Sequence, residues 1–187
     1  MIRAFVALEV PETVQEALGQ IQGRLKKMGG SVGWVRPDRV HLTLKFLGSV
    51  SEESIPPIAE ALKELSSRTA PFELRPKGCG AFPSMKQMRV IWIGLAGDMK
   101  ALSGLKKGVE EALRPLGFPL EDRPFKPHLT LGRVKGRQRL RSLQEGLLAE
   151  QAFEAEAFDV REVVLYKSDL RPEGAIYTPL FRASFNL

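Results

Sequence analysis

The sequence predicts one domain of mixed helices and strands that is built from two similar lobes. Three observations support this prediction. The only two histidines of the chain each begin a His-Leu-Thr-Leu segment, and the two segments start 87 residues apart (128 minus 41). The same order of strands and helices surrounds each segment. No linker separates the two halves. Such internal repetition is typical of duplicated structural units.

Hydrophobic periodicity places the same elements in both halves. Apolar runs predict strands, and apolar residues spaced by three and four predict helices with one face toward a core. The first half reads as strand 2–8, helix 11–28, strands 32–35 and 40–47, a helix ending near 66, and strand 72–83. The second half reads as strand 89–95, helix 98–113, strand 127–134, helix 138–149, and strands 153–167 and 175–186. We therefore expect one bilobal domain over 1–187, with repeats of approximately 1–85 and 86–187 and the last strands completing the first lobe's sheet.

Composition limits the class of protein. Hydrophobic residues make up 43% and charged residues 27% of the 187 residues, as in soluble globular proteins. No apolar run approaches the roughly 20 residues that span a bilayer, and the N-terminus lacks a signal-peptide pattern. Cys79 is the only cysteine, which excludes an intramolecular disulfide and a cysteine-rich zinc site. We expect a cytoplasmic protein without a membrane segment, and the net charge of +6 favours anionic partners.

Each motif presents an imidazole beside a hydroxyl. Alternate residues of a strand point to the same face, so His41 and Thr43 project together while the two leucines project into the core. The same alternation pairs His128 with Thr130. If the two motif strands lie near a two-fold axis, both histidines face one cleft.

This set of groups suits the cleavage of a phosphodiester. A neutral imidazole can take a proton from the attacking oxygen, and a protonated imidazole can give one to the leaving oxygen. A histidine pKa of about 6.5 makes both states accessible near neutral pH. The threonine hydroxyls can donate to the non-bridging phosphoryl oxygens. A duplication kept only for packing is the structural alternative.

Other chemistries have less support. Two histidines without cysteines or flanking carboxylates fall short of a metal site, so we expect no metal and no cofactor. P-loop, dinucleotide-binding and nucleophile-elbow motifs are absent. Gly78 and Gly80 indicate a bulge in a strand, and Cys79 between them is expected to be buried, not nucleophilic.

Several segments resemble the two-histidine phosphoesterase superfamily. Within it, the chain is similar to the bacterial and archaeal RNA 2',3'-cyclic phosphodiesterases, also called 2'-5' RNA ligases. The similar segments are RAFVALEVP (3–11), HLTLKFLG (41–48), VIWIGL (90–95), PFKPHLTLGR (124–133) and LYKSDLRPEGAIYTPL (165–180). The resemblance implies an α+β fold of two pseudo-symmetric lobes, each with an antiparallel sheet and outer helices, around a central basic cleft.

The resemblance also implies an activity and roles for particular residues. It implies hydrolysis of 2',3'-cyclic phosphate ends to 2'-phosphate ends without ATP or metal, with His41 as proton donor and His128 as proton acceptor. Thr43 and Thr130 match the threonines that hold the phosphate.

Two further residues match substrate-binding positions of the family. Arg133 matches an arginine close to the substrate, and Phe46 matches an aromatic that stacks on the base. Each lies five residues after its histidine, so alternation would turn it away from the cleft unless a bulge or the end of the strand intervenes. Lys45 has the parity to face the phosphate.

The expected partner is an RNA with a 2',3'-cyclic phosphate end, tRNA fragments included, and the expected state is a monomer. The reverse reaction would be a 2'-5' ligation in which the two histidines exchange roles. Two other functions stay open. One is a cyclic phosphodiesterase for a small nucleotide, of the ADP-ribose cyclic phosphate type. The other is a non-catalytic RNA-end binding module, which would bind tightly without any hydrolysis.

Overall fold

The computed structural model describes residues 1–187 and contains nine strands and four α-helices, with three short 3-10 helices between them. In chain order the elements are β1 (Ile2–Glu9), α1 (Glu12–Met28), β2 (Val32–Trp34), β3 (His41–Val50), α2 (Ile55–Ser67), β4 (Phe72–Pro83), β5 (Met88–Gly97), α3 (Met99–Leu113), β6 (Leu129–Val134), α4 (Leu140–Ala149), β7 (Phe158–Val160), β8 (Glu162–Asp169) and β9 (Ile176–Ser184). The elements expected from periodicity are present in the expected order, with one exception.

The exception is the expected strand 153–167. The chain instead forms β7 and β8, separated at Arg161, and the two belong to different sheets. β7 pairs with β4, whereas β8 pairs with β1. Apolar residues recur throughout this stretch, so the two strands read as one in the sequence. The transfer of the chain from one sheet to the other at Arg161 leaves no periodicity signal.

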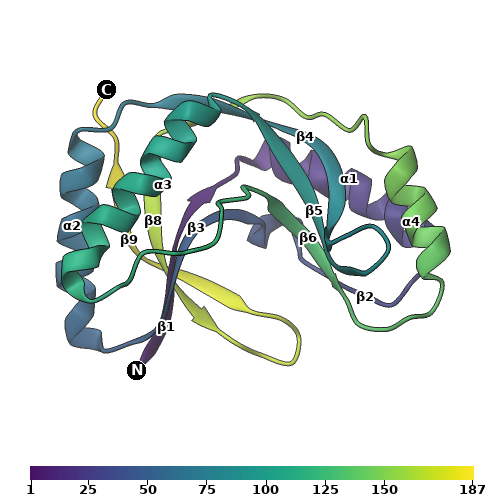
Figure 1. Ribbon diagram of the computed structural model, residues 1–187, viewed down its shortest axis with the longest axis horizontal. Helices are drawn as coiled ribbons and strands as arrows, with labels where there is room; N and C mark the ends of the chain where they lie inside the picture. The colour runs from purple at the N-terminus through teal and green to yellow at the C-terminus, as the bar shows by residue number, and fades with distance from the viewer.

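The strands form two sheets in which every pairing is antiparallel. One sheet has four strands in the order β3-β1-β8-β9, and the other has five in the order β2-β6-β5-β4-β7. Helices α2 and α3 cover the four-stranded sheet, while α1 and α4 lie on the five-stranded sheet (Figure 1). This is the α+β architecture of two antiparallel lobes that the sequence and its resemblance predicted.

The two sheets correspond strand by strand. The order β3-β1-β8-β9 matches β6-β5-β4-β7, and β2 is an additional edge strand beside β6. In this correspondence β4 of the first half lies in the second sheet, and β8 of the second half lies in the first. The halves of the chain therefore exchange strands, and β3 and β6 contact each other where the sheets meet (Figure 1).

One hydrophobic core extends through both lobes, and it includes the four motif leucines, each at most 2% exposed. A separate apolar cluster of Phe5, Ala7, Val164 and Tyr166 covers the opposite face of the four-stranded sheet. That opposite face carries His41. None of the helices combines the length and the apolarity that a bilayer crossing requires.

Candidate functional site

Both motif histidines are anchored in the same way. The Nδ1 of His41 lies 3.0 Å from the carbonyl oxygen of Arg39, and the Nδ1 of His128 lies 2.7 Å from that of Lys126. A carbonyl oxygen can only accept, so each Nδ1 carries a hydrogen and donates it. In both rings Nε2 is then the nitrogen that exchanges a proton: it accepts in the neutral ring and donates in the protonated one.

Aromatic rings fix the plane of each imidazole. His41 is 4.8 Å from the ring centroid of Phe5 and meets the edge of Tyr177 at 5.0 Å. His128 meets the edge of Phe82 at 5.0 Å. Tyr177 lies on β9 and Phe82 on β4, so each ring comes from a hairpin beside its own histidine. Together with the Nδ1 bond, these contacts hold each imidazole in one orientation.

The surroundings of His41 change its pKa. Burial lowers the pKa of His41 below its usual value, and the charge of His128 lowers it further, while the hydrogen bond to Arg39 acts in the opposite direction. An interaction between the two charges requires that the rings lie near each other, in agreement with the contact between β3 and β6. In the free protein His41 is therefore biased toward its neutral form.

A bulge interrupts each motif strand at the equivalent place. In β3 the register shifts so that Thr43 pairs with Ala7 but Lys45 pairs with Val6. In β6 it shifts so that Thr130 pairs with Trp92 but Gly132 pairs with Ile91. From each histidine onward the exposure pattern is identical, namely half-buried, buried, half-buried, buried, buried, exposed.

The bulges explain the odd offset of the two predicted substrate residues. Each bulge adds a residue opposite the partner strand and reverses the later alternation. Phe46 consequently pairs with Phe5, on the face of His41, and its ring lies 6.1 Å from that of Phe5. Arg133 pairs with Val90, on the face of Thr130. The structure thus contains the bulges that the offsets required.

The same bulge overturns the expectation for Lys45. Its side chain is 3% exposed, with Nζ 2.7 Å from the carboxylate of Glu110 and 2.9 Å from the carbonyl oxygen of Pro119. Simple alternation placed Lys45 beside the histidine, but the bulged position turns it into the interior. Lys45 is part of the structural support of the strand.

Three arginines that reach the same place add positive charge. Burial raises the pKa of the Tyr177 hydroxyl, and the charges of Arg133, Arg39 and Arg3 counteract part of that rise. Arg133 belongs to the five-stranded sheet, whereas Tyr177 belongs to the four-stranded one. Positive charge from both lobes therefore acts at Tyr177, whose ring centroid is 5.0 Å from that of His41, and would attract a phosphate there.

Four residues of this site were not expected from the sequence, namely Arg3, Arg39, Tyr177 and Phe82. Arg3 lies two residues before Phe5 on β1, and alternation along that strand could have suggested that it shares the histidine's face. Tyr177 and Phe82 gave no such signal, because only the packing of distant strands brings them to the imidazoles.

The arrangement supplies two proton-exchanging nitrogens, two hydroxyls and positive charge. It can take a proton from one oxygen, give a proton to another and attract an anion between them. No group of three or more His, Cys, Asp or Glu side chains lies together in a way that could hold a metal ion. Cys79 is buried, and burial raises the pKa of its thiol to about 11, in line with the expected structural role. The Gly78 bulge is also present.

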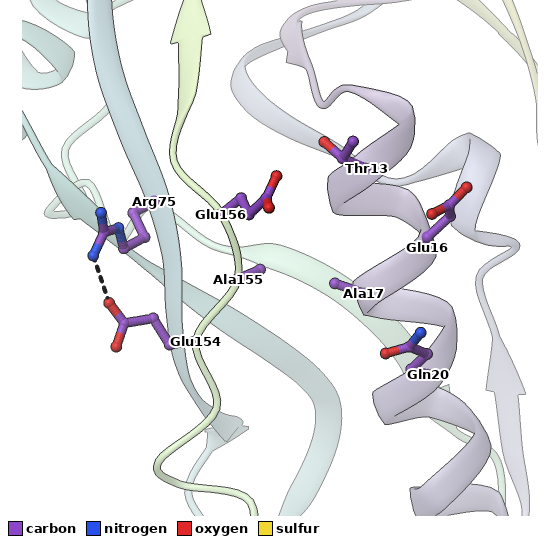
Figure 2. A pocket seen from close by; sticks show the side chains of 8 residues that line it. All are labelled: Thr13, Glu16, Ala17, Gln20, Arg75, Glu154, Ala155 and Glu156. Atoms are coloured by element: carbon purple, nitrogen blue, oxygen red, sulfur yellow. Dashed lines mark hydrogen bonds and ion pairs between the residues drawn. The ribbon is translucent and has the colours of Figure 1, made fainter.

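The hollow in Figure 2 is a different place. It lies between α1 and the segment 154–156 and contains neither histidine. The carboxylates of Glu16 and Glu156 line it, and its only cation, Arg75, is paired with Glu154 at 2.8 Å. An anionic substrate would meet net negative charge there, so the hollow does not compete with the histidines as a phosphate site.

Comparison with known proteins agrees with this geometry. A family model described as LigT like Phosphoesterase matches twice, over residues 8–92 and 93–177, so each match contains one histidine motif. A protein of Methanothermobacter thermautotrophicus named RNA 2',3'-cyclic phosphodiesterase is 35% identical over 179 residues, which cover 96% of each chain. A Thermus thermophilus protein of the same name is 36% identical, covering 98% of this chain and 90% of its own.

Solved structures give the same result. A crystal structure of a Thermus thermophilus protein superposes with a TM-score of 0.81 at 30% identity, with 98% of each chain covered. E. coli LigT in complex with 3'-AMP superposes with a TM-score of 0.76 at 26% identity, covering all of this chain and 99% of its own.

Proposed function

The chain belongs to the LigT-like phosphoesterase family, and from this premise we propose that it is an RNA 2',3'-cyclic phosphodiesterase. The observation that carries the proposal is the pair of imidazoles, each with Nδ1 bonded to a carbonyl and each free to exchange a proton at Nε2. Relatives of the protein bear the name of that activity, and a similar solved structure contains a 3'-nucleotide.

The proposed reaction uses the two lobes for opposite tasks. His128 Nε2 takes a proton from water, whose oxygen then bonds to phosphorus. The bond from phosphorus to the 3'-oxygen breaks, and His41 Nε2 gives that oxygen a proton. The product carries a 2'-phosphate, and the two histidines have exchanged their protonation states. The approach of an anionic phosphate raises the pKa of His41, which lets it carry the proton it must donate.

The surrounding residues hold the substrate. Thr43 and Thr130 donate their hydroxyl hydrogens to the two non-bridging oxygens, where charge accumulates in the transition state. Arg133 adds positive charge from the five-stranded sheet. Phe46 is 65% exposed on the histidine's face, which suits a ring that stacks on a base. No step requires a metal or ATP.

The remaining parts of the proposal concern the protein's state. We propose that residues 1–187 act as one domain and as a monomer in the cytoplasm, where a lone buried thiol stays reduced. The partner is an RNA end with a cyclic phosphate, and 2'-5' ligation is the reverse of the same step.

A defined RNA oligomer with a 2',3'-cyclic phosphate end tests the function. In EDTA and without ATP, the protein should convert it to a 2'-phosphate end, which chromatography of the released terminal nucleotide distinguishes from a 3'-phosphate. Preferred turnover of ADP-ribose cyclic phosphate would indicate a small-nucleotide enzyme. Tight binding without hydrolysis would indicate a binding module. Full activity in either His41→Ala or His128→Ala would disprove the two-histidine mechanism.

A further inference from the structure

A bulge disrupts the regular hydrogen-bond ladder between strands. At each of the two bulges beside the histidines, a buried side chain donates a hydrogen bond to a backbone carbonyl group. In β3 this carbonyl belongs to Leu44, and the Nζ of Lys106 donates to it at 2.6 Å. In β6 it belongs to Leu131, and the Nε2 of Gln22 donates to it at 3.0 Å. Leu44 and Leu131 occupy the same place in the two motifs.

The two donors are equivalent in the fold but differ in chemistry. Lys106 lies on α3 and Gln22 on α1, the helix that follows the leading strand in each half. Both side chains are buried, Lys106 at 7% and Gln22 at 2% exposure. Burial of a polar side chain is costly unless it is fully hydrogen-bonded, so two such groups aimed at two equivalent carbonyls indicate a shared task.

We propose that Lys106 and Gln22 are positioning residues that set where Phe46 and Arg133 lie. Each donor anchors the carbonyl group at the bulge of its motif strand. The bulge reverses the alternation of side chains along the strand. The residue two positions after the anchored carbonyl, Phe46 or Arg133, therefore faces the substrate. Neither donor touches the histidines through a hydrogen bond. The inference rests on the proposed function for its kinetic test and on the fold alone for its structural test.

The kinetic test is a pair of double-mutant cycles on the cyclic-phosphate RNA. Lys106→Met and Phe46→Ala should each raise KM about tenfold with a smaller change in kcat, and the double variant should be no worse than Phe46→Ala alone. Gln22→Met and Arg133→Ala should behave in the same way. Crossed pairs, such as Lys106→Met with Arg133→Ala, should show effects that multiply.

Lys107→Met is the matched control, because Lys107 is the next residue of α3, is exposed and does not reach the bulge. Its KM should equal that of the original protein. A donor that only stabilised the fold would lower the melting temperature and leave the KM of the folded protein unchanged. The proposal would also be overturned if the KM effects of a donor and its own substrate residue multiplied, as in Lys106→Met combined with Phe46→Ala.

The structural test does not depend on turnover. Nuclear Overhauser contacts between the rings of Phe5 and Phe46 should be present in the original protein and in Lys107→Met, and lost in Lys106→Met. Contacts retained in Lys106→Met would refute the role of Lys106 even if the RNA were not a substrate. If Lys106→Met does not fold, the Gln22 cycle decides, because the neutral donor can be removed without breaking an ion pair.

Discussion

The two lobes carry the same motif in different surroundings. His41 lies among Phe5, Tyr166 and Tyr177, and burial lowers its pKa. His128 contacts the edge of a single aromatic ring, that of Phe82. Duplicated geometry therefore anchors the two imidazoles alike, while the aromatic packing around them differs. The lowered pKa by itself favours the neutral form of His41, so its proposed role as proton donor depends on the rise in pKa that a bound phosphate produces.

The supports of the two motifs differ as well. At the second bulge position the first lobe has Lys45 and the second has Gly132, where an added Cβ would lie 2.7 Å from Val32. The additional strand β2 occupies that space in the second lobe. In the first lobe the space is filled by the charged groups Lys45, Lys106, Glu110 and Glu121. The same bulge is thus supported by ion pairs on one side and by a strand and an amide on the other.

Removal of either imidazole should have the largest effect. His41→Ala and His128→Ala should each lower kcat/KM by about 10²–10⁴-fold, the usual contribution of a general acid or base. The pH profile separates the proposed roles: loss of His128, the proposed proton acceptor, should remove the limb at low pH, and loss of His41, the proposed proton donor, should remove the limb at high pH. The reverse assignment of limbs would show that the lobes exchange their tasks.

Removal of the buried donors should expose the difference between the two supports. Lys106→Met should lower the free energy of unfolding by about 3 kcal/mol, the low end for a broken buried ion pair, because Glu110 keeps Lys45. Gln22→Met should cost about 1–2 kcal/mol, because it removes the hydrogen bonds to the carbonyls of Leu131 and Val35 but Leu131 keeps its bond from the backbone N–H of Val35. Urea denaturation measures the free energy of unfolding of both variants. The exposed Lys107→Met should change that free energy by less than about 0.5 kcal/mol. Equal losses of unfolding free energy in Lys106→Met and Gln22→Met would contradict the difference between the two supports.

The threonines should behave alike in both lobes. Thr43→Val and Thr130→Val should each reduce kcat about 10–100-fold, the value of a hydrogen bond to a charged group. Thr43→Ser and Thr130→Ser keep the hydroxyl and should retain most of the activity. A large loss at only one of the two positions would mean that a single lobe holds the phosphate.

The smallest effect concerns the titration of His41. Because the chain has two histidines, His128→Gln leaves one imidazole to follow by NMR. The pKa of His41 in this variant should be below about 6.5. It should be higher than in the original protein, because the like charge of His128 is gone, and it should rise further when inorganic phosphate is added.

The same pKa shift has a consequence for stability. Since folding lowers the pKa of His41, the unfolded chain binds more protons below about 6.5, so stability should fall as the pH decreases through that window. His41→Gln should weaken this dependence. An unshifted pKa of His41 would show that its buried aromatic surroundings do not change its titration.

Local sequence was sufficient for most of the fold and for the histidine motifs. Periodicity marked the strands and helices, repetition marked the two lobes, and alternation placed Thr43 and Thr130 beside their histidines. The helix expected over 98–113 begins with Asp98 as its cap, and the carboxylate of Asp98 accepts from the amide of Ala101 at 2.9 Å. These features depend on residues close together in the chain, where spacing and geometry are tied.

Tertiary structure decided the remainder. Alternation placed Lys45 toward the phosphate and left Phe46 and Arg133 facing away, and only the bulges reversed this. The bulges in turn depend on Lys106 and Gln22, which lie 62 and 109 residues from the carbonyls they support. Contacts between such distant residues leave no periodic signal. The duplicated motif thus specified two equal imidazoles, and the packing around them decided how they differ.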